Sequence, residues 1–308
     1  MNAFDTLLAE EIHCAVITSL CQDLGLLPSQ IFNSSLPDES QCRELFQSAQ
    51  SLDVTASLVD ISEQAQANVI CKEACVFVGK DWVEKTFSLL DQQLQINWFT
   101  KDGQHHEAGE TLFELKGNTR AILTGERTAL NFAQTLSATA TTVSFYADLL
   151  KDSRTNILDT RKTLPGLRYG QKYAVKCGGG ENHRIGLYDR FLIKENHIMG
   201  CGSISKAVEA AKSQHKGILI EVEVENLQEL QEAIAAGVDI VMLDNFDLDS
   251  IKQAVAINAE KVKLEVSGNI ESSHLLQLGR TGVDYVSSGA ITKHVQAIDL
   301  SLRLQNNG

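Results

Sequence analysis

Basic side chains, prolines and long apolar runs are all scarce in this chain of 308 residues. Its 27 Lys and Arg residues face 40 Asp and Glu residues, so the formal net charge is −13, which argues against a general nucleic-acid or anionic-membrane binder. No apolar run approaches the roughly 18 residues that a membrane span needs. We therefore expect no nucleic-acid partner and no membrane partner, and we expect any anion to bind at a local basic site.

The seven cysteines include no CxxC pair, which favours reduced structural thiols over a disulfide framework or a zinc site. A metal-storage or redox protein built on these cysteines is the least favoured interpretation. The sequence also contains no GxSxG elbow and no Walker-type phosphate loop. Residues 1–13 include acids where a secretory signal would carry Lys or Arg, so a cytoplasmic location is expected.

Up to about residue 125 the sequence is typical of a mixed α+β unit. Ile12, Val16 and Leu20 share one helical face and predict an opening helix. We therefore place a first domain over residues 1–125. Its strands are predicted over residues 54–61, 74–79, 94–99 and 111–115.

From about residue 126 the pattern changes to a repeat of strand, polar loop and helix. Leu227, Leu230 and Ile234 share a helical face, and Gly237 stands where a left-handed C-terminal cap belongs. Repeated βα units of this kind imply a parallel α/β barrel, which we expect to be a catalytic domain over residues 126–290. Its six strands are predicted over residues 156–160, 190–194, 218–224, 238–243, 262–266 and 283–287.

Polar side chains gather at the carboxyl ends of these predicted strands. Active sites of α/β barrels lie at that end, because the loops there are free to vary. An ordinary loop explains any one of the polar ends, but not the whole set. The polar ends comprise residues 159–162, 194–197, 221–225, 244–245, 267–269 and 288–290.

Positive charge is concentrated in residues 151–194. This stretch holds ten Lys and Arg residues against four acids, a local net charge of +6 in a chain of −13. Arg presents a planar fork to a carboxylate or phosphate, and Lys acts as a point charge. A ligand with several negative groups is the expected partner, and a solvated basic face is the alternative. Within the stretch, His183 beside Arg184 is a candidate donor to an anion, whereas His197 is expected to orient a loop.

Two short turns, Ser267-Gly268-Asn269 and Ser288-Gly289-Ala290, each follow a predicted strand and precede a predicted helix. Gly lets backbone N–H groups approach an oxygen closely. A phosphate held by the last two loops of a barrel is a recurrent arrangement. The two turns therefore predict a phosphate site.

Glu221, Glu223 and Glu225 alternate with valines on one predicted strand, so a period of two sends their carboxylates to one face. Together with Asp244 at the end of the next strand, they are suited to hold a divalent ion, share hydroxyl hydrogen bonds, stabilise a developing cation, or pair with neighbouring Lys or Arg. We favour Glu223 and Asp244 as the functional pair, with Glu221 and Glu225 as supporting residues.

Eight motifs occur in the order that the quinolinate phosphoribosyltransferase family shows, and the chain resembles that family over roughly residues 120–300. The family is also called nicotinate-nucleotide pyrophosphorylase (carboxylating). No residue of these motifs is missing. The motifs are Gly125–Asn131, Asp159–Gly166, Gly178–Arg184, Leu192–His197, Glu221–Asn226, Leu243–Phe246, Glu265–Asn269 and Gly289–His294.

The resemblance implies a reaction of quinolinate with phosphoribosyl pyrophosphate, giving nicotinate mononucleotide, pyrophosphate and CO₂ in de novo NAD synthesis, with Mg²⁺. It implies an open or incomplete α/β barrel and an N-terminal α/β sandwich domain over residues 1–125, completed by residues 291–308. It also implies a homodimer, in which the sandwich domain of one subunit covers the barrel of the other. Arg127, Arg161, His183 and Arg184 would then surround the quinolinate carboxylates. Arg127 would reach in from the partner subunit.

The resemblance also implies a catalytic set of Lys162, Lys194, Glu223 and Asp244. The two lysines would contact anionic groups of both substrates, with Thr160 as a further substrate-binding residue. Glu223 and Asp244 would face the ribose and hold the metal, directly or through water or substrate. The two Ser-Gly turns would hold the 5′-phosphate.

Two other functions stay open at this point. A pyrophosphorylase of the same fold that acts on nicotinate would lack the decarboxylation step. A non-catalytic barrel that binds a phosphorylated ligand would leave Glu223 and Asp244 without a role. The sequence leaves undecided the order of substrate binding, the number of metal ions, assembly beyond a dimer, and loop closure.

Overall fold

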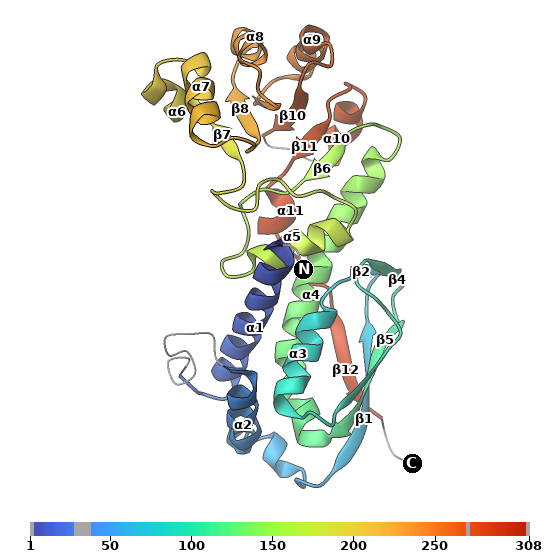
Figure 1. Cartoon of the computed structure of the whole chain (residues 1–308). Helices are drawn as coiled ribbons and strands as arrows, with labels where there is room; N and C mark the ends of the chain where they lie inside the picture. Colours follow the sequence, from blue (N-terminus) through green and yellow to red (C-terminus); the bar gives the residue numbers. More distant parts are fainter. Residues whose placement is uncertain (1–2, 28–37, 269–271, 306–308) are drawn as a thin grey trace. The chain divides into compact units, whose positions relative to one another are not determined.

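The computed structural model describes residues 3–27, 38–268 and 272–305. The chain forms two compact units (Figure 1), each described by itself below. The first comprises Met1–Thr141, Leu164–Cys177 and Val295–Gly308, and the second comprises Thr142–Thr163 and Gly178–His294. The division differs from the predicted boundary at residues 125 and 126, because one continuous helix, α4 (Thr119–Leu150), crosses that position.

The first unit is built on an antiparallel sheet in the order β12-β1-β5-β3. The last strand of the chain belongs to it, since Leu302 of β12 pairs with Val69 of β1. A separate two-stranded sheet is formed by β2 (Cys75–Phe77) and β4 (Gln104–His106). The four strands of the larger sheet are β1 (Gln64–Cys71), β3 (Gln95–Trp98), β5 (Thr111–Asn118) and β12 (Leu300–Leu304).

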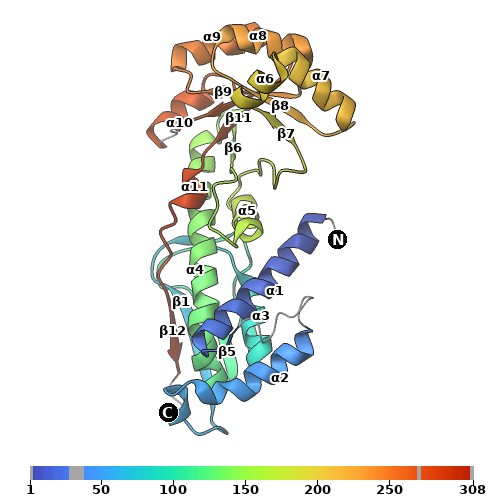
Figure 2. The ribbon, with the colours of Figure 1, turned by 90° about the vertical axis from the view of Figure 1, so that its left-hand side faces the viewer.

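The first unit's helices bury two apolar clusters. Side chains of α3 and α4, such as Phe87 and Leu130, pack with Phe113 of β5 in one cluster, and Figures 1 and 2 show both helices beside the sheet. Leu20 and Phe46 pack with Trp82 in the other. Burial of such side chains contributes roughly 1.5–3 kcal/mol each. The helices are α1 (Ala3–Asp23), α2 (Glu39–Ala49), α3 (Lys80–Leu90), α4 and α5 (Arg168–Cys177).

The prediction of a strand over residues 54–61 is wrong. This part of the chain contains the short 3₁₀ helices η2 (Gln50–Leu52) and η3 (Ala56–Leu58). The Asp53 carboxylate accepts the backbone N–H groups of Thr55 and Ala56 and so bends the chain there. Of the alternating aliphatic side chains that suggested a strand, Ala56 is buried, but Val54, Leu58 and Ile61 are exposed, with Leu58 at 86%.

The second unit holds six parallel strands in the order β6-β11-β10-β9-β8-β7. All six predicted strands are present, which confirms the incomplete α/β barrel. Among the described residues, the edge strands β6 and β7 do not pair with each other, and Leu158 of β6 bridges instead to Glu181. The strands are β6 (Asn156–Leu158), β7 (Phe191–Ile193), β8 (Ile220–Val224), β9 (Ile240–Asp244), β10 (Lys263–Ser267) and β11 (Tyr285–Ser287).

Helices follow the barrel strands and lie outside them (Figure 2). As predicted, Gly237 ends α8 in the left-handed conformation, at φ 71°. Within the described ranges, no helix is both long enough and apolar enough to cross a membrane. The helices are α6 (Glu195–Cys201), α7 (Ile204–Gln214), α8 (Leu227–Ala236), α9 (Leu248–Asn258), α10 (Ser272–Gly279) and the short α11 (Ala290–Lys293).

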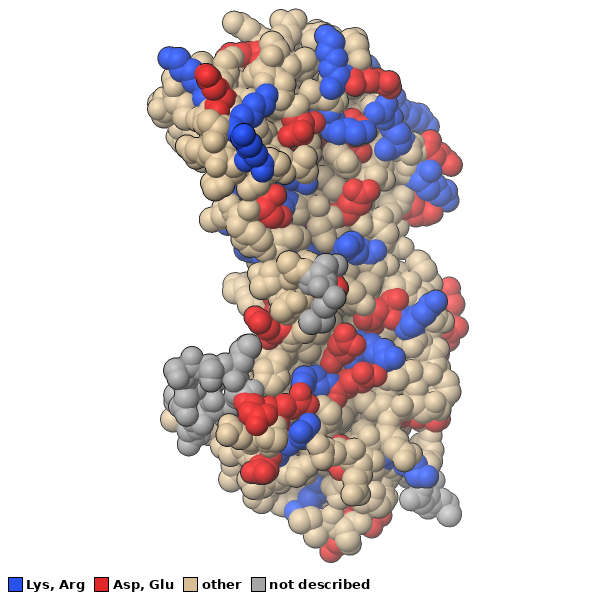
Figure 3. All heavy atoms as spheres, viewed as in Figure 1, with Lys and Arg blue, Asp and Glu red and all other residues tan. Residues whose placement is uncertain are grey.

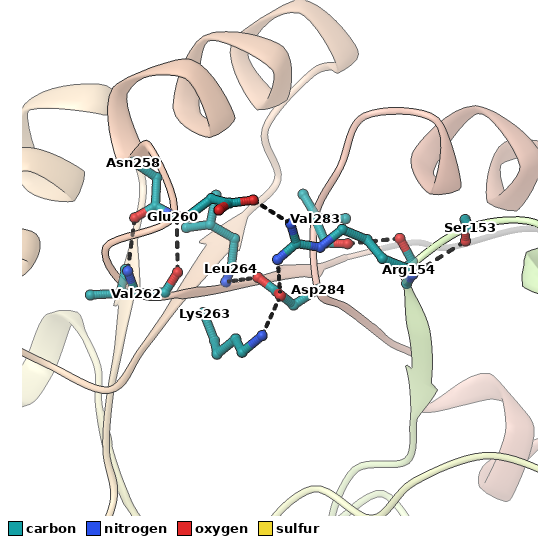
Figure 4. Close-up of polar contacts among 10 residues, drawn as sticks. Ser153, Arg154, Asn258, Glu260, Val262, Lys263, Leu264, Val283 and Asp284 are labelled. Atoms are coloured by element: carbon teal, nitrogen blue, oxygen red, sulfur yellow. Dashed lines mark hydrogen bonds and ion pairs between the residues drawn. The ribbon is translucent and has the colours of Figure 1, made fainter.

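A polar network fastens the amino ends of three barrel strands (Figure 4). The Asp284 carboxylate, which precedes β11, accepts from Arg154 before β6 at 2.5 Å, from Lys263 of β10 at 2.7 Å and from the Leu264 N–H at 3.0 Å. Burial alone would raise the pKa of Asp284, but these donors outweigh it and hold the pKa below its usual value. In α/β barrels the amino ends of the strands contribute to stability, whereas the active site lies at the carboxyl ends. We therefore assign this network a role in stability.

Candidate active site

A cavity of about 710 Å³ opens at the carboxyl ends of the barrel strands. Each of the six strands, or the loop directly after it, contributes to its wall, so the polar strand ends predicted above do converge. A volume of this size suits a ligand of metabolite dimensions. The lining residues are Thr160, Arg161, Lys162, His183, Arg184, Leu192, Lys194, Glu223, Met242, Asp244, Asn245, Glu265, Ser267, Gly268, Ser287 and Gly289.

Two carboxylates and a lysine meet on one side of the cavity. The Lys194 ammonium, directly after β7, contacts the Glu223 carboxylate on β8. Asp244 at the end of β9 accepts a hydrogen bond from the Asn245 amide at 2.8 Å. Asn245 has a left-handed backbone, with φ 56°, an uncommon conformation that polar Asn tolerates best. Glu223 and Asp244 are thus brought together on neighbouring strands, as the sequence predicted.

Arg161 and Arg184 add positive charge to the same cavity. Burial, followed by repulsion from Arg161, lowers the pKa of Arg184 from its usual value. An arginine remains charged under all physiological conditions, so the lowered pKa reflects the cost of burying the Arg184 guanidinium and, second, of placing it near Arg161. An anion bound between them would relieve that cost.

Lys162 is held in place by its neighbours. Its backbone N–H donates to the Thr160 hydroxyl at 3.0 Å, and its carbonyl accepts from the Thr292 hydroxyl at 2.8 Å. A Cβ atom built on Gly289 would lie 2.6 Å from the Lys162 Cδ. Gly289 thus leaves the space that the stem of Lys162 occupies.

His183 lies at the buried floor of the cavity, with 5% of its side chain exposed. Its Nδ1 accepts a hydrogen bond from the Arg184 backbone N–H at 2.7 Å. Its Nε2 lies 2.9 Å from the Glu221 carboxylate and 3.6 Å from that of Glu265. Both ring nitrogens therefore face groups of the protein itself.

Glu221 and Glu265 are fully buried beside that imidazole. Burial alone would raise the pKa of Glu221, but His183 and Arg190, whose guanidinium lies 3.2 Å away, outweigh it and leave the pKa lowered. Burial, and then the charge of Glu221, raise the pKa of Glu265 well above its usual value. The Glu265 carboxyl is therefore harder to ionise than the Glu221 carboxyl beside it.

The predicted basic stretch, residues 151–194, is not one basic surface. Only four of its ten cations line the cavity. α5 carries Arg168, Lys172 and Lys176 into the other compact unit, and Arg154 and Arg190 are paired with Asp284 and Glu221. Figure 3 likewise shows Lys and Arg interspersed with Asp and Glu on the displayed face of each unit. The net charge of a sequence segment does not determine where the fold places each of its charged side chains.

Several other predicted site residues lie elsewhere. Glu225 follows β8 and is exposed. Glu221, Glu223 and Glu225 therefore have three different environments. Ser288 is buried, and its N–H donates to the Leu158 carbonyl. Its hydroxyl accepts a hydrogen bond from the Ala290 N–H at 3.3 Å. Neither Ser288 nor Ala290 lines the cavity. Ser267 and Gly268 do line it.

Two further predicted residues are not part of the cavity as described. Asn269 lies outside the described residues. Arg127 belongs to α4 in the first unit, where its side chain is 59% exposed and its guanidinium lies 3.6 Å from the Glu126 carboxylate. Its role in substrate binding stays a prediction that requires a partner subunit.

The sequence placed Asn245 at a polar strand end without giving it a role, and it did not single out Glu265 or the apolar walls formed by Leu192 and Met242. One signal for Glu265 was available, since a glutamate stands in the middle of the otherwise apolar run Leu264–Val266. A charged residue inside such a strand requires a partner or a function.

The open parallel barrel, with a polar cavity at its strand ends, places the protein among the α/β-barrel enzymes. Comparison with known proteins narrows that class. Models of the C-terminal and N-terminal domains of quinolinate phosphoribosyl transferase match residues 139–303 and 53–137. The chain therefore belongs to the quinolinate phosphoribosyl transferase family.

Individual relatives agree with this assignment. The chain is 41% identical over 251 residues to a Bacillus subtilis protein named "Probable nicotinate-nucleotide pyrophosphorylase [carboxylating]", covering 81% of this chain and 87% of that protein. A solved nicotinate-nucleotide pyrophosphorylase from Francisella tularensis is 48% identical with a TM-score of 0.81, over 87% of this chain and 97% of that one. Human nicotinic acid phosphoribosyltransferase, at 14% identity and a TM-score of 0.59 over 84% of this chain and 73% of that one, shares the fold alone.

Proposed function

We propose that the protein transfers the phosphoribosyl group of phosphoribosyl pyrophosphate to quinolinate, and that decarboxylation then gives nicotinate mononucleotide. The observation that carries the proposal is the convergence of four cations, Arg161, Lys162, Arg184 and Lys194, with the carboxylates of Glu223 and Asp244 in one cavity of a family member. Quinolinate is a dianion, and its co-substrate carries several phosphates. A cationic cavity in an acidic protein suits this pair of substrates.

The cations bind and orient the substrates. Arg161 and Arg184 are placed to hold the two quinolinate carboxylates by charge-assisted hydrogen bonds. The Lys194 ammonium contacts the Glu223 carboxylate, and an incoming phosphate competes for that ammonium. Ser267 and Gly268, with Gly289, provide the turns that bind the 5′-phosphate. The protein's main contribution to the rate is position and electrostatic field.

The chemistry proceeds by attack of the pyridine nitrogen on the anomeric carbon of the ribose. The bond from that carbon to pyrophosphate breaks, and its electron pair leaves with pyrophosphate. Positive charge develops on the ribose, where the Glu223 and Asp244 carboxylates stabilise it. The ring nitrogen is then positive, so the electrons of the adjacent carbon–carboxylate bond flow into the ring as CO₂ leaves. A proton replaces CO₂ on that carbon.

Mg²⁺ is the cofactor that this site suits. Glu223 and Asp244 are hard oxygen ligands on the cavity wall, and Mg²⁺ in such enzymes is commonly held by one or two carboxylates together with substrate phosphates. When bound, the ion neutralises charge on the leaving pyrophosphate. The two carboxylates would hold it directly or through water or substrate.

The active form in this proposal is a homodimer. Arg127 is largely exposed, and its guanidinium has a carboxylate of its own chain only at 3.6 Å, so it is available to a neighbouring subunit. The nearby segment 52–61 also carries exposed aliphatic side chains at Leu52, Val54, Leu58 and Ile61, which supports association. Arg127 from one subunit would complete the quinolinate site of the other.

A cytoplasmic location is part of the proposal. All seven cysteines are free thiols in the structure, which supports a reducing compartment. Cell fractionation with an antibody to the protein tests this point.

One assay tests the reaction. Purified protein is incubated with phosphoribosyl pyrophosphate, Mg²⁺ and either quinolinate or nicotinate, and CO₂ and nicotinate mononucleotide are measured together. Equal amounts of CO₂ and nicotinate mononucleotide, formed with quinolinate but not with nicotinate, support the proposal. Mononucleotide formed from nicotinate without CO₂ would reveal the rival pyrophosphorylase instead. Calorimetric binding of ligand without turnover would reveal a non-catalytic barrel.

A further inference from the structure

The buried pair Glu221 and Glu265 has no role in the mechanism above, although both carboxylates lie beneath the substrate cavity. Glu265 lines the cavity and is fully buried. Neither of its oxygens makes a hydrogen bond of ordinary geometry with a described residue, although Ser287 and Glu221 lie close enough to influence its pKa. Leaving a buried polar group unsatisfied costs roughly 1–3 kcal/mol. Such an arrangement calls for a functional explanation.

A metal ion does not supply that explanation. His183, Glu221 and Glu265 offer ligand atoms that all lie within 4.8 Å of one another, which is a spacing that metals use. A coordinating Nε2, however, would require the imidazole proton to sit on Nδ1. Nδ1 already accepts the Arg184 N–H at 2.7 Å, so it carries no proton. The Arg190 guanidinium, 3.2 Å from Glu221, further disfavours a cation here.

The hydrogen bond to Nδ1 fixes the state of His183. An imidazole that accepts at Nδ1 is neutral and carries its single proton on Nε2. That N–H faces two carboxylates, with oxygens of Glu221 at 2.9 Å and of Glu265 at 3.6 Å.

We propose that Glu221 and Glu265 are positioning residues for the binding of the pyridine dicarboxylate. Together they hold His183 as the neutral imidazole with its proton on Nε2. Through the bond from the Arg184 N–H to Nδ1, this imidazole fixes the main chain that carries the Arg184 guanidinium. The chain of contacts runs from the buried carboxylates to His183, and from His183 to Arg184. This inference rests on the proposed function for its substrate, but not for the state of His183.

The first experiment needs no activity. Protein labelled with ¹⁵N-histidine is examined without substrate by long-range ¹H–¹⁵N NMR, and the His183 signals are assigned by their loss in His183→Gln. The expected spectrum shows a protonated Nε2 and an unprotonated Nδ1. An imidazolium, or a proton on Nδ1, would overturn the inference even in a fully active enzyme. The expected spectrum in a protein without turnover would uphold the positioning network and reject only the proposed function.

The second experiment measures coupling. Glu221→Gln and Glu265→Gln are each expected to raise the KM for quinolinate by about tenfold, with kcat changed by less than about twofold, because a misplaced arginine weakens substrate and transition state alike. In a His183→Gln background the same substitutions should have no further effect, because they act through His183. Additive effects, or a fall in kcat at unchanged KM, would contradict the proposal. Glu209→Gln, on an exposed position of α7, is the matched control and should change neither parameter.

Discussion

Gly289 packs closely against the side chain of Lys162 in the wall of the cavity. A Cβ on Gly289 would lie 2.6 Å from the Lys162 Cδ and 3.3 Å from the Lys162 Cβ. Gly289 has φ −74° and ψ −15°, a conformation that any residue adopts, so its backbone does not need glycine. The space does. A substitution there therefore acts on Lys162 rather than on main-chain strain.

Gly289→Ala should lower kcat/KM by on the order of tenfold, because the methyl group displaces the Lys162 stem and its ammonium loses its place on an anionic group. Steady-state kinetics with both substrates measures the effect. Gly200→Ala is the matched control, since nothing lies within 4 Å of a Cβ on Gly200. Wild-type kinetics for Gly289→Ala would show that Lys162 does not depend on this contact.

Arg184→Ala and Arg161→Ala should each lower kcat/KM for quinolinate by about tenfold to several hundredfold, since each removes a charge-assisted hydrogen bond of roughly 1.5–3 kcal/mol. Arg280→Ala, an exposed arginine outside the cavity lining, is the control. Near-normal turnover by either cavity variant would remove that arginine from the site.

The barrel was predictable because its local signals agree with one another. Short apolar runs such as Ile240–Leu243 end in a polar residue, and Gly237 marks the end of the preceding helix. The loop Asp53–Ile61 was not predictable in the same way, because its aliphatic residues imitate a strand while the Asp53 carboxylate bends the chain. Alternation alone does not say whether an apolar face will be buried.

The cavity was predictable in its parts but not in its floor. Arg161, Lys194 and Asp244 follow strands, and strand ends converge in any parallel barrel. Glu221 on β8 and Glu265 on β10 lie on either side of the strand β9. Their proximity therefore depends on the register of both strands against β9, which the sequence does not reveal. The placement of α5 is likewise a tertiary fact, since the Glu11 carboxylate of α1 accepts the N–H groups of Tyr169 and Gly170 and caps this helix within the first unit.

Arg127→Ala and Lys194→Ala proteins should each be nearly inactive, and mixing them should restore part of the activity. A mixed dimer contains one site with both native residues if Arg127 is contributed by the partner subunit. The recovered rate is measured after subunit exchange has been verified with differently tagged chains. Exchange without recovery would rule out the shared site.

Removal of Mg²⁺ by a chelator should lower turnover by at least on the order of 100-fold, because the ion neutralises charge on the leaving pyrophosphate. The midpoint of thermal unfolding should stay unchanged, since Glu223 is paired with Lys194 and Asp244 with the Asn245 amide in the folded chain without the ion. Glu223→Gln and Asp244→Asn should each raise the Mg²⁺ concentration needed for half-maximal rate. Full activity in the chelated enzyme would contradict the assignment of both carboxylates.

Asp284→Asn should destabilise the barrel at neutral pH without affecting the cavity. Asp284 accepts from Arg154, Lys263 and the Leu264 N–H and is 8% exposed, so loss of its charge should cost about 1–3 kcal/mol of the free energy of unfolding. Its pKa is lowered in the folded state from the ordinary 3.8, so its contribution is complete above about pH 3.8 and is lost as the pH falls through the folded value.

Urea unfolding of Asp284→Asn and wild type should therefore differ most at pH 7 and converge as the pH is lowered below about 3.8. Asp249→Asn serves as the control, because Asp249 is 84% exposed and pairs only with Lys252 on the same helix, a pair worth little in water. A difference that persists unchanged at acid pH would mean that the carboxylate's shape, and not its charge, holds the three strands. Unchanged kcat/KM in Asp284→Asn at neutral pH would separate the stability of the amino end of the barrel from the chemistry at its carboxyl end.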